Sequence, residues 1–423
     1  MYSYAVSLEI KTLKLIRKYK GKNICIALKL ICWNLAVIFR ALVNAMFFRD
    51  STETFYRLYT ETGRPIANKC PPNMVPPIPP RGSICIDIDK ALELNPRIKK
   101  IALIFFMGIG DYFLSTNFIE MLKARYPKIS LQALVSKNVD SNNSPIVGKA
   151  IEKNPHFDKI CYFDGHSDYN DWRNYDYRDC SSQIDDETLL LPLICHHHEA
   201  VTSRTSTICE TFCFPSPNIA MPPIVYTDYE ASENVKQIFD QAMQKLSSGQ
   251  CKRLAFLQVS SRSSQYTYPH VDELISLLLA QEYCVICVDK HHIVSENCIN
   301  IDVATFDINE SIKLVSMLRQ HGIILITVVS CFWAISSGLN IPNLGMQHWD
   351  DRCIASVWHP NIYVIAHDSY KYLPKSRTFL AGQNDFTQNS YGDSKHDGFY
   401  NYKAKFVIEC LLKMLEIEKL TSR

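Results

Sequence analysis

The chain has 423 residues, of which 47% are hydrophobic and 21% charged, and this ordinary globular composition excludes wholesale disorder. The length suits two domains plus an extension, at about 100–200 residues per domain. Lys and Arg total 45 and Asp and Glu total 43, and the resulting net charge of +2 argues against a dedicated nucleic-acid-binding protein. Many of the 16 cysteines lie inside apolar runs, where they behave as small hydrophobic residues. With no cleavable signal peptide at the start, we expect a reduced, cytoplasmic protein.

Residues 1–69 form a basic, apolar segment that we expect to be a helical extension. The first 49 residues carry a net charge of +8, which leaves −6 for the rest of the chain. The longest uncharged run in the apolar stretch 24–48 is 30–39, shorter than the ~20 residues that span a bilayer. Two interpretations remain open. The helix lies on an anionic membrane surface, as on the inner face of the plasma membrane, or it docks on the protein itself or on a second subunit.

Residues 70–97 are expected to be a proline-rich linker. Six prolines fall within positions 71–80, and proline is excluded from helix interiors and central strands. The pattern favours a stiff connector over a proline-motif ligand for a partner domain.

From residue 98 onward, short apolar runs alternate with amphipathic stretches, a pattern typical of parallel sheets covered by helices. The sequence predicts strands at 100–106, 130–135, 159–163, 253–259, 284–289 and 323–329. It predicts helices at 111–126, 145–153, 231–246, 271–281, 309–320, 332–338 and 402–419. We therefore expect an α/β protein with Rossmann-like, doubly wound domains at 98–225 and 226–400 that face a cleft, followed by a C-terminal helix at 401–423.

The most informative segment is 104–117, in which a predicted strand runs directly into Gly108, Gly110 and Asp111. Two glycines allow a tight turn and the close approach of a ligand. The acid would then lie at the carboxyl end of the strand, where ligands bind in such folds. The alternative is that Asp111 only caps the following helix.

The run from Gly108 through Asp111, Leu114, Ser115-Thr116 and 122–127 resembles the opening motif of the heptosyltransferases of glycosyltransferase family 9. Segments 133–135, 154–160 and 163–164 are also similar to that family, and 307–318, 322–326 and 339–342 are similar more loosely. The resemblance covers roughly residues 98–365. It implies the GT-B fold, an acceptor held by the first domain and a nucleotide-sugar donor held by the second.

The resemblance implies roles for Asp111 and the residues around it, whereas His197 and the hydroxyl-rich segment 260–264 are candidates because of their residue types and positions. Asp111 would be the general base of an inverting transfer that needs no cofactor and no metal. The acceptor-binding candidates are Gly108, Gly110, Ser115, Thr116 and His197. The candidates for the nucleotide sugar are Ser260, Ser261, Arg262, Ser263, Ser330 and Trp333. Adjacent histidines such as His196–His198 do not match a known metal-ligand spacing, so we expect them at the surface or near the acceptor.

The donor loop departs from the family pattern. Where the family has Asp-x-Gly-x-x-His, segment 329–334 lacks the acid, the glycine and the histidine. A second hypothesis is therefore a catalytically degenerate, glycosyltransferase-like binding or assembly subunit. A third, a nicotinamide-dependent oxidoreductase, lacks the third glycine of GxGxxG. The expected partners are a nucleotide-sugar donor, carrying heptose or another sugar, and a glycan or lipopolysaccharide-type glycolipid acceptor.

Overall fold

The structure is a computed structural model, and it describes residues 87–105, 108–136, 146–163, 184–193, 208–209, 212, 214, 221–260, 267–288, 295–302, 306–347, 359–367, 375–387 and 401–421. The expected extension at 1–69 and most of the expected linker lie outside these residues. The described part of the linker contains a helix, α3 (Ile88–Leu94). Asp87 caps it and Ile88 and Ala91 are buried, so this end of the segment belongs to the folded body.

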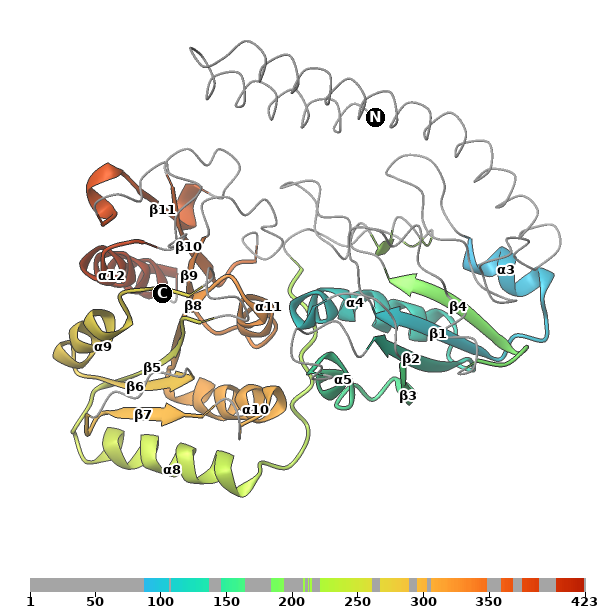
Figure 1. Cartoon of the computed structure of the whole chain (residues 1–423), viewed down its shortest axis with the longest axis horizontal. Coiled ribbons are helices and arrows are strands. Elements are labelled where there is room, and N and C mark those ends of the chain that lie inside the picture. The colour runs from blue at the N-terminus through green and yellow to red at the C-terminus, as the bar shows by residue number, and fades with distance from the viewer. Residues whose placement is uncertain are drawn as a thin grey trace, which may run out of the picture.

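The first domain is built on a four-stranded, fully parallel sheet with the order β3-β2-β1-β4 (Figure 1). Its strands are β1 (Lys100–Phe105), β2 (Ser130–Ser136), β3 (Phe157–Phe163) and β4 (Thr188–Leu193). Among the described residues, α4 (Ile109–Arg125) follows β1 and α5 (Ile146–Ile151) follows β2. The strand order reverses between β1 and β4, so the switch point of this sheet lies between them.

The second domain holds a seven-stranded parallel sheet with the order β11-β10-β9-β8-β5-β6-β7. Its strands are β5 (Arg253–Gln258), β6 (Tyr283–Val288), β7 (Cys298–Ile301), β8 (Ile324–Val328), β9 (Asn343–Met346), β10 (Ile362–His367) and β11 (Thr378–Ala381). Its helices are α8 (Glu233–Ser247), α9 (Val271–Ala280), α10 (Ile308–Leu318), α11 (Cys331–Gly338) and α12 (Ala404–Thr421). Short 3-10 helices lie at Arg319–His321, Lys375–Arg377 and Gln383–Asp385. The switch point of this sheet lies between β5 and β8.

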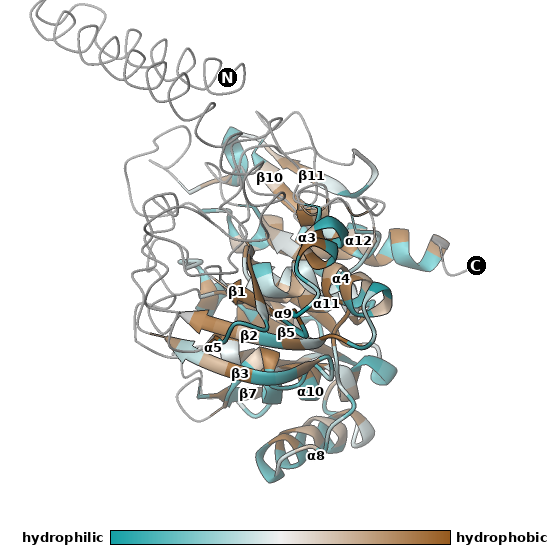
Figure 2. Ribbon diagram, turned by 90° about the vertical axis from the view of Figure 1, so that its right-hand side faces the viewer, coloured by the Kyte–Doolittle hydropathy of each residue, from teal (hydrophilic) through white to brown (hydrophobic). Residues whose placement is uncertain are grey.

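Successive side chains along each strand point to opposite faces of the second sheet, so each face has its own hydrophobic core. Leu254 and Phe256 share a core with α8, α10 and α11, whereas Ala255 and Leu257 share one with α9 and α12. Figure 2 shows the strands as largely hydrophobic, with hydrophilic residues on the outer side of helices such as α8. A sheet buried on both faces needs near-continuous apolar strands, which is why β5, β6 and β8 were predictable from the sequence.

The two domains are in contact through their helices. Helix α4 packs against α11 and α5 against α10 (Figure 1). One continuous hydrophobic core includes residues of both domains. The connecting segment 221–232 lies along α4: Asn117 donates to the Pro222 carbonyl, and the Ile224 amide donates to Thr116 Oγ1. The Cβ of an alanine at Gly338 would lie 2.5 Å from the Pro223 carbonyl oxygen, so the connection also lies directly on α11.

The expected fold class, two parallel α/β sheets in two Rossmann-like domains, is confirmed by these sheets. The six predicted strands and seven predicted helices are present with shifts of a few residues at their ends. Strands β4, β7, β9, β10 and β11 were not among those predicted from the sequence. All eight cysteines in the described part of the chain are free thiols, and seven of them are buried, as expected for small hydrophobic residues. Within the described ranges, no helix is long and apolar enough to cross a membrane.

Candidate active site

Asp111 lies in the first turn of α4, directly beyond the carboxyl end of β1. Gly108 is the N-cap residue of the helix and makes no side-chain cap bond, so Asp111 occupies the third helical position and is not the N-cap. Its side chain is only 9% exposed. An acid in this turn is favoured by the partial positive charge of the helix N-terminus. The structure thus places a largely buried carboxyl group at the switch point of the first sheet.

Gly110 lies against the second domain at this site. The Cβ of an alanine there would lie 3.4 Å from the Cα of Cys331, the first residue of α11. Helix α11 begins directly beyond β8, at the switch point of the second sheet. The N-termini of α4 and α11, one from each domain, therefore meet beside Asp111.

Ser330 and Ser260 follow the two strands that flank the second switch point. Ser330 caps α11, since its Oγ accepts a bond from the Phe332 amide at 3.2 Å, and it donates to Gln258 Oε1 at 2.6 Å. The Nε2 of Gln258 in turn donates to the Ser260 carbonyl. The ends of β5 and β8 are thus joined through one buried amide side chain, which the sequence analysis did not single out.

Ser115 and Thr116, expected at the acceptor site, are fully buried in α4. Each hydroxyl donates at 2.7 Å to the carbonyl three residues earlier, that of Tyr112 or Phe113. Thr116 Oγ1 also accepts the Ile224 amide from the domain connection at 2.8 Å. These contacts favour a role at the domain interface over direct contact with an acceptor.

Trp333, expected at the nucleotide sugar, is 3% exposed and packs into a small apolar cluster with Ile362, Val364 and Ala366. Its ring lies directly over Gly345 of β9, where an added Cβ would come within 2.3 Å of Cζ2. The contacts of this side chain are those of a core residue.

Four expected site residues, His197, Ser261, Arg262 and Ser263, lie outside the described residues, as do His196 and His198. By sequence, residues 261–263 continue from Ser260 beyond β5. His197 comes four positions after Leu193, the last residue of β4. Their roles remain predictions.

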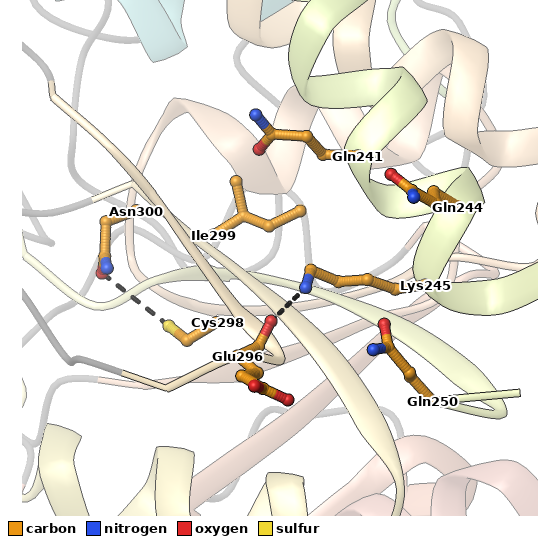
Figure 3. A pocket seen from close by; sticks show the side chains of 8 residues that line it. All are labelled: Gln241, Gln244, Lys245, Gln250, Glu296, Cys298, Ile299 and Asn300. Atoms are coloured by element: carbon orange, nitrogen blue, oxygen red, sulfur yellow. Dashed lines mark hydrogen bonds between the residues drawn. The ribbon is translucent and has the colours of Figure 1, made fainter. Parts of the chain in front are cut away.

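One cavity of about 560 Å³ lies between α8 and the edge strand β7, where polar side chains such as Gln241 and Gln244 surround Lys245 (Figure 3). Lys245 donates to the Glu296 carbonyl there. Gln250 and Glu296 precede β5 and β7, so the cavity is at the amino ends of these strands. Asp111 and Ser330 follow the carboxyl ends, and ligands of doubly wound sheets bind at that opposite end.

The chemistry available at the switch points is that of a base beside two helix N-termini. A carboxylate can accept a proton, and helix N-termini favour negatively charged groups such as phosphates. Burial raises the pKa of Tyr112, which therefore stays protonated and uncharged next to Asp111. Asp111 is thus the better candidate for a base. In the described part of the chain, no group of three or more His, Cys, Asp or Glu side chains is placed so that it could bind a metal ion.

Comparison with known proteins gives structural neighbours only, since no protein-family model and no curated protein matches the chain. The glycosyl transferase family 9 structure from Veillonella parvula is 13% identical, with a TM-score of 0.49 over 75% of this chain and 97% of that one. The E. coli ADP-heptose LPS heptosyltransferase II is 15% identical, with a TM-score of 0.48 over 76% and 99%. An E. coli heptosyltransferase solved with ADP is 9% identical, with a TM-score of 0.43 over 74% and 99%.

These neighbours carry the names of heptosyltransferases and of glycosyltransferase family 9, which the sequence motifs resemble. At such identities and TM-scores, the fold assignment rests on the sheet topology of the chain itself. That topology is two doubly wound parallel sheets whose switch points meet at α4 and α11, with Asp111 and Ser330 at the two helix N-termini.

Proposed function

We propose that the chain is an inverting glycosyltransferase that moves a sugar from a nucleotide-diphosphate donor to a glycan or lipopolysaccharide-type acceptor. The observation that carries the proposal is the position of Asp111. A carboxyl group that is 9% exposed lies at the switch point of one domain, beside the N-terminus of α11 at the switch point of the other.

In this reaction Asp111 accepts the proton of an acceptor hydroxyl as that oxygen attacks the anomeric carbon of the donor sugar. The bond from this carbon to the diphosphate oxygen breaks on the opposite face, and the nucleoside diphosphate leaves. One displacement inverts the anomeric centre. The N-terminus of α11 stabilises the charge that develops on the leaving diphosphate.

The donor would bind to the second domain beyond β5 and β8. Ser260 and Ser330 are the described residues there, and Ser261, Arg262 and Ser263 supply hydroxyls and a guanidinium by sequence. Arg pairs well with phosphate because its planar donors form two parallel bonds. The transferred sugar would be a heptose or another sugar, such as a hexose.

The acceptor would bind to the first domain, near Gly108 and Gly110. Residues 1–49, with a net charge of +8, would bring the enzyme to an anionic membrane surface that carries a lipid-linked acceptor. Co-sedimentation with anionic vesicles checks this part. Equal recovery of the full chain and a chain without residues 1–69 would exclude the membrane role.

A thermal-shift titration with ADP, GDP, UDP and their sugar conjugates tests the proposed function, with inorganic phosphate as the control. A ligand at 100 times its dissociation constant stabilises the folded state by about 2.7 kcal/mol, which is readily seen as a rise in melting temperature. If none of the nucleotides raises the melting temperature above the phosphate control, the proposal is wrong.

The second candidate function is a degenerate, glycosyltransferase-like binding or assembly subunit. The observation that favours it is the donor loop, which lacks the family's acid, glycine and histidine and whose Trp333 is buried in the core. Nucleotide binding without any sugar transfer or donor hydrolysis would support this candidate over the enzyme.

A further inference from the structure

Gln258 is the last residue of β5 and is 8% exposed, although its side chain is polar. Its amide has two described contacts. The Oε1 accepts the Ser330 hydroxyl at 2.6 Å, and the Nε2 donates to the Ser260 carbonyl. A buried amide is costly unless it is hydrogen-bonded, and here both ends of the amide have partners.

The bond to Ser330 also fixes the direction of a second bond. A serine hydroxyl has one proton, which Ser330 gives to Gln258, so its oxygen is left to accept the Phe332 amide. That second bond is the N-cap of α11. Gln258 therefore orients the cap of the helix whose first residue lies against Gly110.

The bond from Gln258 to the Ser260 carbonyl holds the chain just beyond β5, on the other side of the switch point. Ser260 stands two residues beyond the end of β5, where the hydroxyl-rich segment begins. One side chain thus holds the start of the loop after β5 and the start of α11 after β8 at a fixed separation. The proposed donor site lies beyond the ends of these two strands.

We propose that Gln258 is a positioning residue for the donor, which holds the segments after β5 and β8 in the geometry that binds a nucleoside diphosphate. Gln258 need not touch the ligand itself. This inference rests on the proposed function, since it assumes that the second domain binds a nucleotide diphosphate.

The test compares Gln258→Leu with Gln132→Leu in the full chain. Gln132 lies on β2 of the first sheet and is also 8% exposed, so the same substitution removes an equally buried amide far from the second switch point. Affinity for ADP, GDP and UDP is measured by calorimetry, and circular dichroism verifies that each variant is folded. We expect Gln258→Leu to weaken the best of these ligands about tenfold and Gln132→Leu to change it less than twofold.

Gln258→Glu gives a second readout that a purely structural role would not change. Its carboxylate still accepts the Ser330 hydroxyl but cannot donate to the Ser260 carbonyl, and it adds a negative charge beside the diphosphate. Burial at this position raises the pKa of a Glu carboxyl, so part of it is protonated at pH 5 and regains a donor. The affinity deficit relative to the wild type should therefore shrink as the pH is lowered from 8 to 5.

The outcomes separate the two claims. If the wild type binds none of the three nucleotides, the proposed function fails and this inference loses its basis. If the wild type binds but Gln258→Leu binds equally well, only the inference is overturned. A deficit of Gln258→Glu that stays constant with pH would also overturn it.

Discussion

At the scale of single residues, the decisive question is whether Asp111 acts as a base or only stabilises the N-terminus of α4. Both roles suit an acid in the first turn of a helix, but only the base role requires a carboxylate at this place. Asp111→Asn keeps the size of the side chain and removes the base. We expect turnover to fall by about 10²–10⁴ while the affinity for the donor nucleotide changes little. Steady-state kinetics and calorimetry measure the two quantities.

The control for this prediction is Asp272→Asn. Asp272 also lies in the first turn of a helix, α9, but it is exposed and lies on the face of the second sheet that α9 and α12 cover. If Asp111 serves only the helix, neither variant should lose turnover selectively. Near-normal turnover of Asp111→Asn would therefore assign this residue to the helix alone.

His359 gives a second residue-scale prediction, on pH and stability. Burial, and to a lesser extent the charge of Arg377, lower its pKa to about 4, and its side chain is 1% exposed. In the unfolded chain, a histidine binds a proton below about pH 6.5. The unfolded state therefore binds more protons between pH 6.5 and 4, and the free energy of unfolding falls as the pH drops through that window.

Between pH 7 and pH 5 this single group accounts for a loss of about 2 kcal/mol. Urea unfolding at both pH values measures it. His359→Gln, which cannot take up a proton, should be less sensitive to this pH change than the wild type. The exposed His321→Gln should behave like the wild type, and equal pH sensitivity of all three proteins would refute the assignment.

At the scale of elements, α11 is held by a buried polar network as well as by apolar packing. Asn343 of β9 is fully buried, accepts from Thr327 Oγ1 at 3.0 Å and donates to Ser336 Oγ at 2.9 Å. Asn361 donates to the Ser336 carbonyl at 2.8 Å. Hydrogen bonds between buried side chains, as made here by Asn343 and Asn361, favour one packing arrangement over others. The helix that meets Asp111 is thus rigidly placed on its sheet.

The contact between Trp333 and Gly345 offers an element-scale prediction. An alanine Cβ at position 345 would lie 2.3–2.9 Å from three ring atoms of Trp333, and such overpacking costs about 1–3 kcal/mol. Gly345→Ala should lower the free energy of unfolding by that amount, and its cost should shrink in a Trp333→Leu background. Gly382→Ala, where the nearest atom lies at 3.8 Å, is the control. Equal costs in both backgrounds would show that Trp333 does not occupy this position.

Each element that was predicted from the sequence has either a long apolar run or a clear helical period. Strands β1 and β5 have such a run, and helices α8 and α10 have such a period. The missed strand β4 contains Pro192, which reads as a strand breaker, and β7, β9 and β11 have only four residues each. Of the site, Asp111 could be singled out because two glycines and a strand precede it. Gln258 could not, because only the fold brings it to Ser330, 72 residues later in the chain.

At the scale of the whole molecule, the connecting segment makes hydrogen bonds to helices of both domains. Segment 221–232 contacts α4 through Thr116 and Asn117, and it contacts α10 where the Tyr229 hydroxyl donates to the Asn309 carbonyl at 2.8 Å. The shared hydrophobic core adds apolar contact between α4 and α11. The geometry around Asp111 therefore depends on contacts far from it, and loosening the connection should separate the two helix N-termini.

Gly338→Ala tests this dependence. Its Cβ would lie 2.5 Å from both the Pro223 carbonyl oxygen and Val225 Cγ2, so the connection has to move away from α11. We expect a lower melting temperature, a larger radius of gyration in small-angle X-ray scattering and reduced turnover. Gly148→Ala is the matched control, because its Cβ would meet the Tyr162 ring at 2.2–2.7 Å inside the first domain. It should lower the melting temperature and leave the radius of gyration unchanged. The same radius of gyration for Gly338→Ala and the wild type would mean that the connection does not set the spacing of the domains.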